Sequence, residues 1–249
     1  MLLTKVGTEY DHIDIIGTTH EIHNNETDRL MNGYYHKQEV ATVKSLLLKF
    51  SNLNYDKVLD LGCSIGTWYD DYKKFGFKKI IGIDISKERA MKAKERGYDE
   101  IHVCNAYELP FDDQSMNCII SNDVLVHVIQ DSDKLKIFKE VKRVLRDDGI
   151  FIFNIANAGG FGFSNDTTVE YCRMNKWQTI SELIQQSGLD LGIIVPSYYT
   201  IPRIGSNPKF VKPSTKYIFP CIDTILKKMN NLDSAKVVYF TAKKSKIKT

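Results

Sequence analysis

The chain has 249 residues, of which 43% are hydrophobic and 26% are charged, and its formal net charge is +3. These values are those of an ordinary globular protein, and the length suits one large α/β domain or a domain with a small cap. No apolar run approaches the roughly 18–20 residues that span a bilayer, and the N-terminus turns acidic too early for a signal peptide. We therefore expect a cytoplasmic protein without a membrane span.

The cysteine and histidine patterns argue against a disulfide framework and against a metal site. The five cysteines are an odd number, and none of them lie in CxxC spacing. They are typical of reduced thiols in a cytosolic protein. His20 and His23 have the spacing of two metal ligands, but no carboxylate or cysteine set accompanies them, so we predict no metal.

The charge is unevenly distributed along the chain. Residues 200–249 carry eleven Lys or Arg against two Asp or Glu, a balance of +9, which leaves −6 for residues 1–199. The lysines of residues 243–249 have the pattern of a solvated tail. Four basic residues further in lie among prolines and aromatics, where they could flank an anionic substrate. These are Arg203, Lys209, Lys212 and Lys216.

Apolar, β-rich segments alternate with helical patterns, as in a doubly wound parallel sheet. The first predicted element is a helix at about 37–50, after a polar, histidine-rich stretch. Strands are then predicted at 57–61, 79–83, about 100–103, about 117–121 and 149–155. Helices are predicted between them at 66–75, 87–96 and 133–146.

The pattern loosens after residue 156. A helix is predicted at 177–187 and a strand at about 190–197. Residues 200–221 hold four of the six prolines and are expected to form an ordered but irregular insertion. A short helix at 222–231 and a final strand at 235–242 complete the chain. We find no internal repeat, and we expect residues 1–249 to form a single domain.

Residues 57–68, KVLDLGCSIGTW, predict a strand that turns through a glycine loop into a helix. Glycine permits positive φ and lets the backbone approach a ligand closely. The unpaired N–H groups of a helix start favour an anionic or polar ligand. Asp60 places a carboxylate near the strand end, at the edge where an open α/β sheet binds its ligand.

A second carboxylate follows the next predicted strand. Asp84 lies about 20 residues beyond the glycine loop, which is the spacing for hydrogen bonds to a ribose diol. Its alternative role is that of an N-cap for the helix at 87–96. Ser86 already suits that position, so we favour the ribose role for Asp84.

The motifs DLGCSIG, GIDIS, NAYELPFDDQSMNCIISNDVLVH and FKEVKRVLRDDGIFIFNIAN follow one another in residues 56–156. Together they resemble the class I S-adenosylmethionine-dependent methyltransferases, in the small-molecule branch similar to types 11 and 25. The resemblance implies a Rossmann-like, seven-stranded sheet whose last strand is antiparallel, with S-adenosylmethionine bound by residues 56–156. It also implies an N-terminal lid within residues 1–50 and a substrate-side insertion at 199–234.

Matched position by position, the resemblance implies a cofactor site. The methionine part would be lined by Asp60, Gly62, Ser64 and Gly66. Asp84 would hold the ribose, Ile85 would pack on the adenine, and Asn105 and Ala106 would lie at the adenine edge. Position 105 is usually Asp in the family, but the amide oxygen of Asn can also accept a hydrogen bond.

The candidate catalytic and substrate residues are less specific. Asn122 and Asp123 could contact the cofactor or the acceptor, and His127 is either a general base or a brace for the next helix. Tyrosines of the lid could cover the methyl donor or could pack in the core; these are Tyr10, Tyr34 and Tyr35, and Tyr35 is our catalytic candidate. The loop at 158–177 could shape an acceptor pocket through Tyr171, Arg173 and Trp177, and Arg203 could bind the substrate.

The sequence therefore predicts a methyltransferase for a small polar, anionic acceptor, such as a sugar nucleotide, a phosphorylated sugar or another phosphorus-containing precursor of a surface polysaccharide. The alternatives are a lipid or quinone precursor as acceptor, or a non-catalytic protein that binds the cofactor. A nicotinamide-dependent dehydrogenase would need GxGxxG, whereas residues 62–66 read GxxxG. Nucleic acid is not expected as a partner, and we expect a monomer or homodimer.

Overall fold

The computed structural model describes residues 26–158, 168–169, 172–199 and 214–245. It gives no side-chain description of residues 26–29 and 168–169. The predictions made for Tyr10, Tyr171 and Arg203, and for the two N-terminal histidines, lie outside the described residues.

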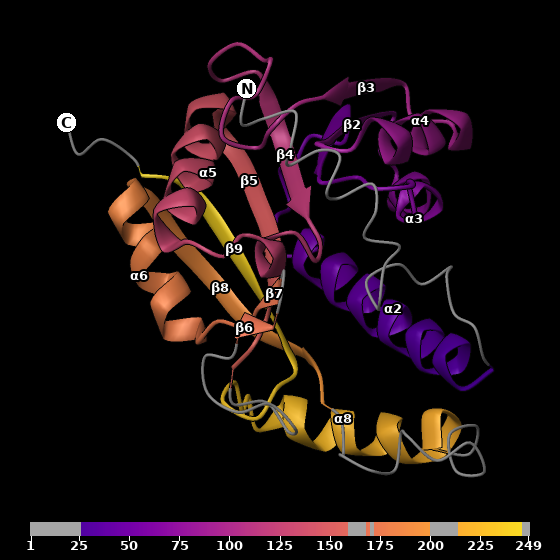
Figure 1. The fold of residues 1–249 in the computed structure, drawn as a ribbon. Coiled ribbons are helices and arrows are strands. Elements are labelled where there is room, and N and C mark those ends of the chain that lie inside the picture. Colours follow the sequence, from indigo (N-terminus) through magenta and orange to yellow (C-terminus); the bar gives the residue numbers. More distant parts are fainter. Residues whose placement is uncertain (1–25, 159–167, 170–171, 200–213, 246–249) are drawn as a thin grey trace.

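The centre of the fold is a seven-stranded sheet in the order β3-β2-β1-β4-β5-β9-β8 (Figure 1). The strands are β1 (Lys57–Leu61), β2 (Lys79–Asp84), β3 (Glu100–Val103), β4 (Met116–Ser121), β5 (Leu145–Ala156), β8 (Leu189–Tyr198) and β9 (Val237–Lys244). The first five run parallel, and β9 is antiparallel to both β5 and β8. The predicted sheet with an antiparallel last strand is thereby confirmed. An additional short hairpin, β6 (Thr168–Val169) with β7 (Cys172–Arg173), was not predicted.

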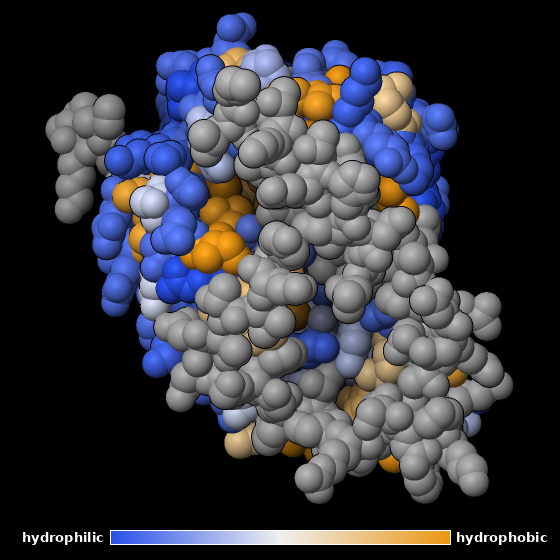
Figure 2. All heavy atoms as spheres, in the orientation of Figure 1, coloured by the Kyte–Doolittle hydropathy of each residue, from blue (hydrophilic) through white to orange (hydrophobic). Residues whose placement is uncertain are grey.

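Helices cover both faces of the sheet (Figure 1). One face carries α2 (Glu26–Leu47), α3 (Tyr69–Phe75) and α4 (Lys87–Arg96), and the other carries α5 (Asp131–Val144) and α6 (Trp177–Ser187). Successive strand residues point to opposite faces, so Val58 packs with the first layer and Leu59 with the second. Most of the described surface seen in Figure 2 is hydrophilic, as expected where amphipathic helices form the outer layers.

The chain reverses its winding direction between β1 and β4. From β1 it proceeds outward to β2 and β3, then returns to place β4 on the other side of β1. Neighbouring helices then lie on opposite faces, which leaves a crevice at the carboxyl ends of these two strands. The fold therefore predicts its ligand site at the end of β1 and β4.

Helix α2 and strand β5 both begin earlier in the chain than predicted. Helix α2 begins at Glu26 and not at about 37, since Met31 and Tyr34 are buried against Phe219 far along the chain. Strand β5 begins at Leu145 and not at 149, so it includes Asp147 and Asp148, which follow the predicted helix at 133–146. The pairing with β4 skips from Leu145 to Ile150, so these polar residues form an exposed bulge.

The described part of the predicted insertion lies against the N-terminal helix. It comprises a short π-helix, η2 (Ser214–Ile218), and α8 (Phe219–Lys228). The hydroxyl of Tyr34 donates a hydrogen bond to Asp223, and the ammonium of Lys227 donates to the Gln38 side chain at 2.9 Å. Within the described ranges, no helix combines the length and apolar character needed to cross a membrane.

Candidate functional site

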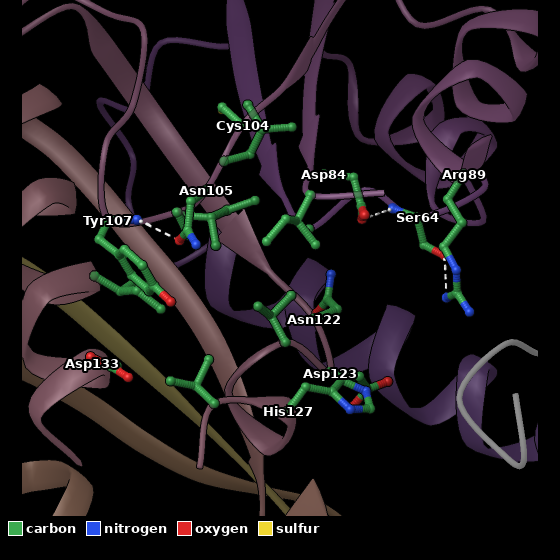
Figure 3. A pocket seen from close by; sticks show the side chains of 18 of the residues that line it. Ser64, Asp84, Arg89, Cys104, Asn105, Tyr107, Asn122, Asp123, His127 and Asp133 are labelled. Atoms are coloured by element: carbon green, nitrogen blue, oxygen red, sulfur yellow. Dashed lines mark hydrogen bonds between the residues drawn. The ribbon is translucent and has the colours of Figure 1, made fainter. Parts of the chain in front are cut away.

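A cavity of about 350 Å³ opens at the carboxyl edge of the sheet, at the point where the winding direction reverses. Its wall is built by segments that follow β1, β2, β3 and β4 and by the start of α5 (Figure 3). Most of the residues predicted for cofactor binding meet here: Gly62, Ser64, Asp84, Ile85, Asn105, Ala106 and Asn122. His127, a catalytic candidate, also lines the cavity.

The glycine loop takes a backbone form that only a small residue tolerates. Gly62 has φ +84°, and a Cβ built there would lie 2.2 Å from Cγ2 of Val124. The N–H groups of Gly62 and Cys63 donate to the Ile83 carbonyl at 2.9 and 2.8 Å. The loop after β1 is therefore fastened to the end of β2, and the two segments form one continuous wall.

Asp84 presents a carboxylate that is only partly used by the protein. One oxygen accepts from the Ser64 N–H at 2.8 Å and the other from the Ser86 N–H at 2.9 Å. Burial is the largest influence on the Asp84 carboxyl and raises its pKa. The Ile85 backbone also donates to this carboxylate, which has about four acceptor positions, so acceptor capacity remains for a ribose hydroxyl. Ser86 caps α4 by accepting from the Arg89 N–H, which leaves Asp84 free of that role.

The segment after β3 forms the wall beside Asp84. The side-chain oxygen of Asn105 accepts from the Tyr107 N–H at 3.2 Å, and its amide group keeps further hydrogen-bonding capacity. Cys104 lies next to it, and burial, with the nearby Asp84 charge, raises the pKa of its thiol to about 11. The thiol is therefore neutral at physiological pH, in agreement with a packing role.

Asp60 and Gly66 were expected in the cofactor site, but the structure places both outside the cavity wall. The buried Asp60 carboxylate accepts from the hydroxyls of Tyr72 at 3.0 Å and Tyr98 at 2.5 Å. Burial raises its pKa to about 7. A Cβ at Gly66 would lie 3.0 Å from the Tyr98 ring and 3.1 Å from the backbone of α4, so this glycine serves close packing.

The tyrosines of α2 also lie outside the cavity wall that the described residues form, so the catalytic role of Tyr35 and the substrate role of Tyr34 stay predictions. Tyr35 stacks on Tyr198, with 4.7 Å between the two ring centroids. The Lys236 ammonium lies 4.4 Å from the centroid of the Tyr35 ring. Burial raises the pKa of Tyr35 further above its usual value. Tyr34 is held by Asp223 and packs on Phe219, so both tyrosines follow the core-packing alternative.

The predicted substrate residue Arg173 braces the start of α5. Its guanidinium donates to both oxygens of Asp131, at 2.9 and 3.3 Å, and to the Ile129 carbonyl at 2.9 Å. Trp177 is likewise engaged, since its indole N–H donates to Asp233 at 2.8 Å. Arg173 therefore stabilises a segment that lines the cavity but does not line the cavity itself.

His127 ends a short 3₁₀ helix, η1 (Leu125–His127), directly after β4. Its Nδ1 lies 3.5 Å from the thiol sulfur of Cys172 in β7. Figure 3 shows the imidazole beside the Asp123 carboxylate, on the wall opposite Asn105. This placement is compatible with both alternatives for His127, a base or a structural brace.

Sequence reasoning missed part of the wall. Beyond Cys104, the unassigned lining residues are Leu61, Ile83, Arg89, Tyr107, Val124, Val128, Ile129, Gln130, Asp133 and Ile137. Four of them, Val124, Val128, Ile129 and Gln130, belong to the segment between β4 and α5, whose irregular turns carry no periodic signal. The position of this segment directly after a buried strand was the one signal that could have found it. No group of three or more potential metal ligands occurs in the described part of the chain.

Comparison with known proteins shows which family the central part of the chain matches. The sequence profile of a family described as "Methyltransferase domain" matches residues 59–153, the span that builds the cavity. Residues 59–153 thus carry a domain of the class I S-adenosylmethionine-dependent methyltransferase type.

Solved structures of methyltransferases share this fold over nearly the whole chain. One from Clostridium acetobutylicum is 16% identical, with a TM-score of 0.60 over 99% of this chain and 100% of the other. Magnesium protoporphyrin IX methyltransferase from Synechocystis is 15% identical, with a TM-score of 0.60 over 98% and 97%. At these identities the likeness extends to the fold alone.

Among the curated relatives, an uncharacterized protein of Methanocaldococcus jannaschii is 33% identical over 133 residues, which is 52% of this chain and 50% of the relative. Phosphoethanolamine N-methyltransferase 1 of Arabidopsis thaliana is 28% identical over 167 residues, 64% of this chain and 30% of the relative. The chain spans about half the length of the first curated relatives that it matches.

Proposed function

We propose that the protein transfers a methyl group from S-adenosylmethionine to a small polar acceptor that carries an anionic group. The observation that carries this proposal is the cavity at the ends of β1, β2 and β4, with the carboxylate of Asp84 in its wall. When bound, the cofactor supplies an electrophilic methyl group on a sulfonium sulfur. Asp84 would hold its ribose, Ile85 and Ala106 would pack on the adenine, and Asn105 would meet the adenine edge.

The protein's own contribution would be alignment and the exclusion of water. Methyl transfer is an in-line displacement, so a nucleophile held near the methyl group reacts without the entropic cost of a bimolecular encounter. Apolar residues of the wall, among them Val124, Val128 and Ile137, would keep water from the reacting atoms. A base is needed only where the nucleophile is a neutral hydroxyl or amine, and His127 is the group on the wall that suits that role.

The anionic character of the acceptor rests on charge and on relatives. The +9 balance of residues 200–249 offers cations to such a group. Phosphoethanolamine N-methyltransferases of Arabidopsis thaliana and Zea mays are among the related sequences, and their names imply a phosphorus-containing acceptor. The cavity wall itself carries Asp84, Asp123 and Asp133 against Arg89, so the anionic group would lie beyond it. A sugar nucleotide, a phosphorylated sugar or another surface-polysaccharide precursor fits this description.

Thermal unfolding with added nucleotides tests the proposal. A ligand that binds only the folded protein stabilises it by about 4 kcal/mol at a thousand times its Kd, so S-adenosylmethionine and S-adenosylhomocysteine should both raise Tm. NAD should leave Tm unchanged. An unchanged Tm with both sulfur nucleotides would contradict the proposal.

An acceptor screen separates the proposed enzyme from its alternatives. Release of S-adenosylhomocysteine is measured with phosphorylated sugars, sugar nucleotides, lipid precursors and quinone precursors. Turnover with a phosphorylated acceptor is the expected result. Turnover only with a lipid or quinone precursor would favour that alternative, and binding without turnover across the panel would favour a non-catalytic partner protein.

A further inference from the structure

A chain of buried side chains lies directly behind the cavity wall at the end of β4. It starts at Asp123, whose backbone has φ +57°, in the left-handed region that a residue with a Cβ seldom adopts. Asn154 of β5 holds this conformation from two sides. Its side-chain oxygen accepts from the Asp123 N–H at 2.6 Å, and its amide nitrogen donates to Oδ1 of Asp123 at 2.9 Å.

Tyr239 extends the chain from the last strand. It lies directly opposite Asn154 in the β5–β9 ladder, and both side chains are buried. The Tyr239 hydroxyl accepts from the Asn154 amide nitrogen at 3.4 Å and donates to the side-chain oxygen of Asn122 at 2.8 Å. One hydroxyl therefore fixes the rotamers of two asparagines, and through them two adjacent residues of the cavity wall.

The geometry assigns Asn154 and Tyr239 as positioning residues for the sulfonium end of the cofactor, an inference that rests on the proposed function. Neither residue lines the cavity, so both act through Asn122 and Asp123, which do. The family profile ends at residue 153, before either of them.

The consequence of this arrangement is a fixed negative charge at one end of the cavity. Asp123 is half-buried, and Asn154 binds its Oδ1. Among the described residues none donates a hydrogen bond to the second oxygen, and the carboxylate faces the cavity beside His127 (Figure 3). Lys236 and Glu39 lie near enough to interact electrostatically with Asp123. Burial raises the pKa of Glu39 well above its usual value, so the Lys236 ammonium partly offsets Asp123 and Glu39 adds little charge.

A fixed carboxylate distinguishes the charged sulfonium of S-adenosylmethionine from the neutral thioether of S-adenosylhomocysteine. The two ligands otherwise share their adenosine and amino-acid parts, so the ratio of their Kd values reports on this end of the cavity alone. General loosening of the fold would weaken both ligands by the same factor. Loss of the Asp123 orientation would weaken the methyl donor more than the product.

The test uses calorimetric titration of Tyr239→Phe and Asn154→Ser with both ligands. Tyr199→Phe is the matched control, because Tyr199 is equally buried and, among the described residues, its hydroxyl bonds the Leu226 and Asn231 carbonyls alone, at 3.2 and 2.8 Å. We expect the preference for S-adenosylmethionine over S-adenosylhomocysteine to fall roughly fivefold to tenfold in the first two variants, which is the size of one lost hydrogen bond between neutral groups. It should stay unchanged in Tyr199→Phe.

The possible outcomes separate this inference from the proposed function. If the unaltered protein binds neither ligand, the proposed function is wrong and the positioning role falls with it. If it binds both, and Tyr239→Phe changes neither Kd or changes both by one factor, only the positioning role is overturned. Tyr239→Phe removes a single hydroxyl, so it remains informative even where Asn154→Ser does not fold.

Discussion

At the scale of single residues, Asp60 belongs to the sequence motif but does not line the cavity. Its carboxylate belongs to the glycine-loop motif, yet it faces two buried hydroxyls, those of Tyr72 and Tyr98. Tyr72 also accepts from the Asn122 amide at 3.4 Å, so Asp60 supports the cavity wall from behind. Burial makes this carboxyl retain its proton more strongly than it does in the unfolded chain, although the two hydroxyl donors act in the opposite direction.

The raised pKa of Asp60 predicts a pH dependence of stability. Its folded value of about 7 exceeds the reference value of 3.8, so the folded state binds more protons between these two limits. The contribution to stability is therefore complete below about pH 4 and is lost as the pH rises through 7. Between pH 5 and pH 8 the unaltered protein should lose on the order of 2–3 kcal/mol more unfolding free energy than Asp60→Asn.

Urea unfolding of both proteins at several pH values measures this difference directly. Other groups that titrate in the same range, such as Asp223, are present in both proteins and cancel in the comparison. Parallel stability curves for the two proteins would show that Asp60 does not titrate in this window.

At the scale of elements, helix α2 carries a glycine without an evident need for it. Gly33 is exposed within the helix, and a Cβ built there would meet nothing within 4 Å. Gly33→Ala should therefore raise the unfolding free energy by about 0.5–1 kcal/mol, because alanine loses less backbone entropy on folding.

Gly76 is the matched control for this prediction. A Cβ there would also meet nothing within 4 Å, but Gly76 ends α3 with φ +100°. Gly76→Ala should lower the unfolding free energy by about 1 kcal/mol, since alanine is strained in that conformation. Chemical denaturation measures both, and a destabilised Gly33→Ala would mean that α2 is not a continuous helix at this point.

The elements that the sequence predicts best are those whose signals are local. Strand β1 and helices α4 and α6 have the predicted bounds, because a buried strand forms an apolar run in the sequence and both helices end at glycine. The start of α2 and the bounds of α8 were displaced, because the two helices pack on each other across 189 positions of sequence. Local patterns do not contain such contacts.

The candidate site, like the fold, could be predicted where the sequence signal is local and not where a side chain depends on distant contacts. The loop motifs correctly indicated Gly62, Ser64 and Asp84 as neighbours, since strand ends and loops occur at fixed spacings. They could not tell which way Asp60 or Tyr35 would face, because side-chain direction depends on partners from distant elements. The sequence likewise could not show that Tyr239 of β9 hydrogen-bonds Asn122 in the cavity wall.

At the scale of the whole molecule, the sheet brings together the residues that we propose for methyl transfer. The reversal of winding between β1 and β4 creates the crevice, and the last strand braces its floor through Tyr239. The N-terminal helix and α8 pack against each other beside this core and contribute no residue to the cavity wall that the structure describes. The residues that we propose for cofactor binding thus lie at the ends of the central strands and not on α2 or α8.

The most direct test of the cofactor claim is calorimetric titration of the protein and of Asp84→Asn with S-adenosylmethionine. Asn offers one acceptor oxygen where Asp84 offers two, so a ribose diol would lose at least one charged hydrogen bond. We predict one binding site per chain in the unaltered protein and a Kd that is roughly tenfold or more higher in Asp84→Asn. Absence of binding to the unaltered protein, or equal Kd values in the two proteins, would contradict the account.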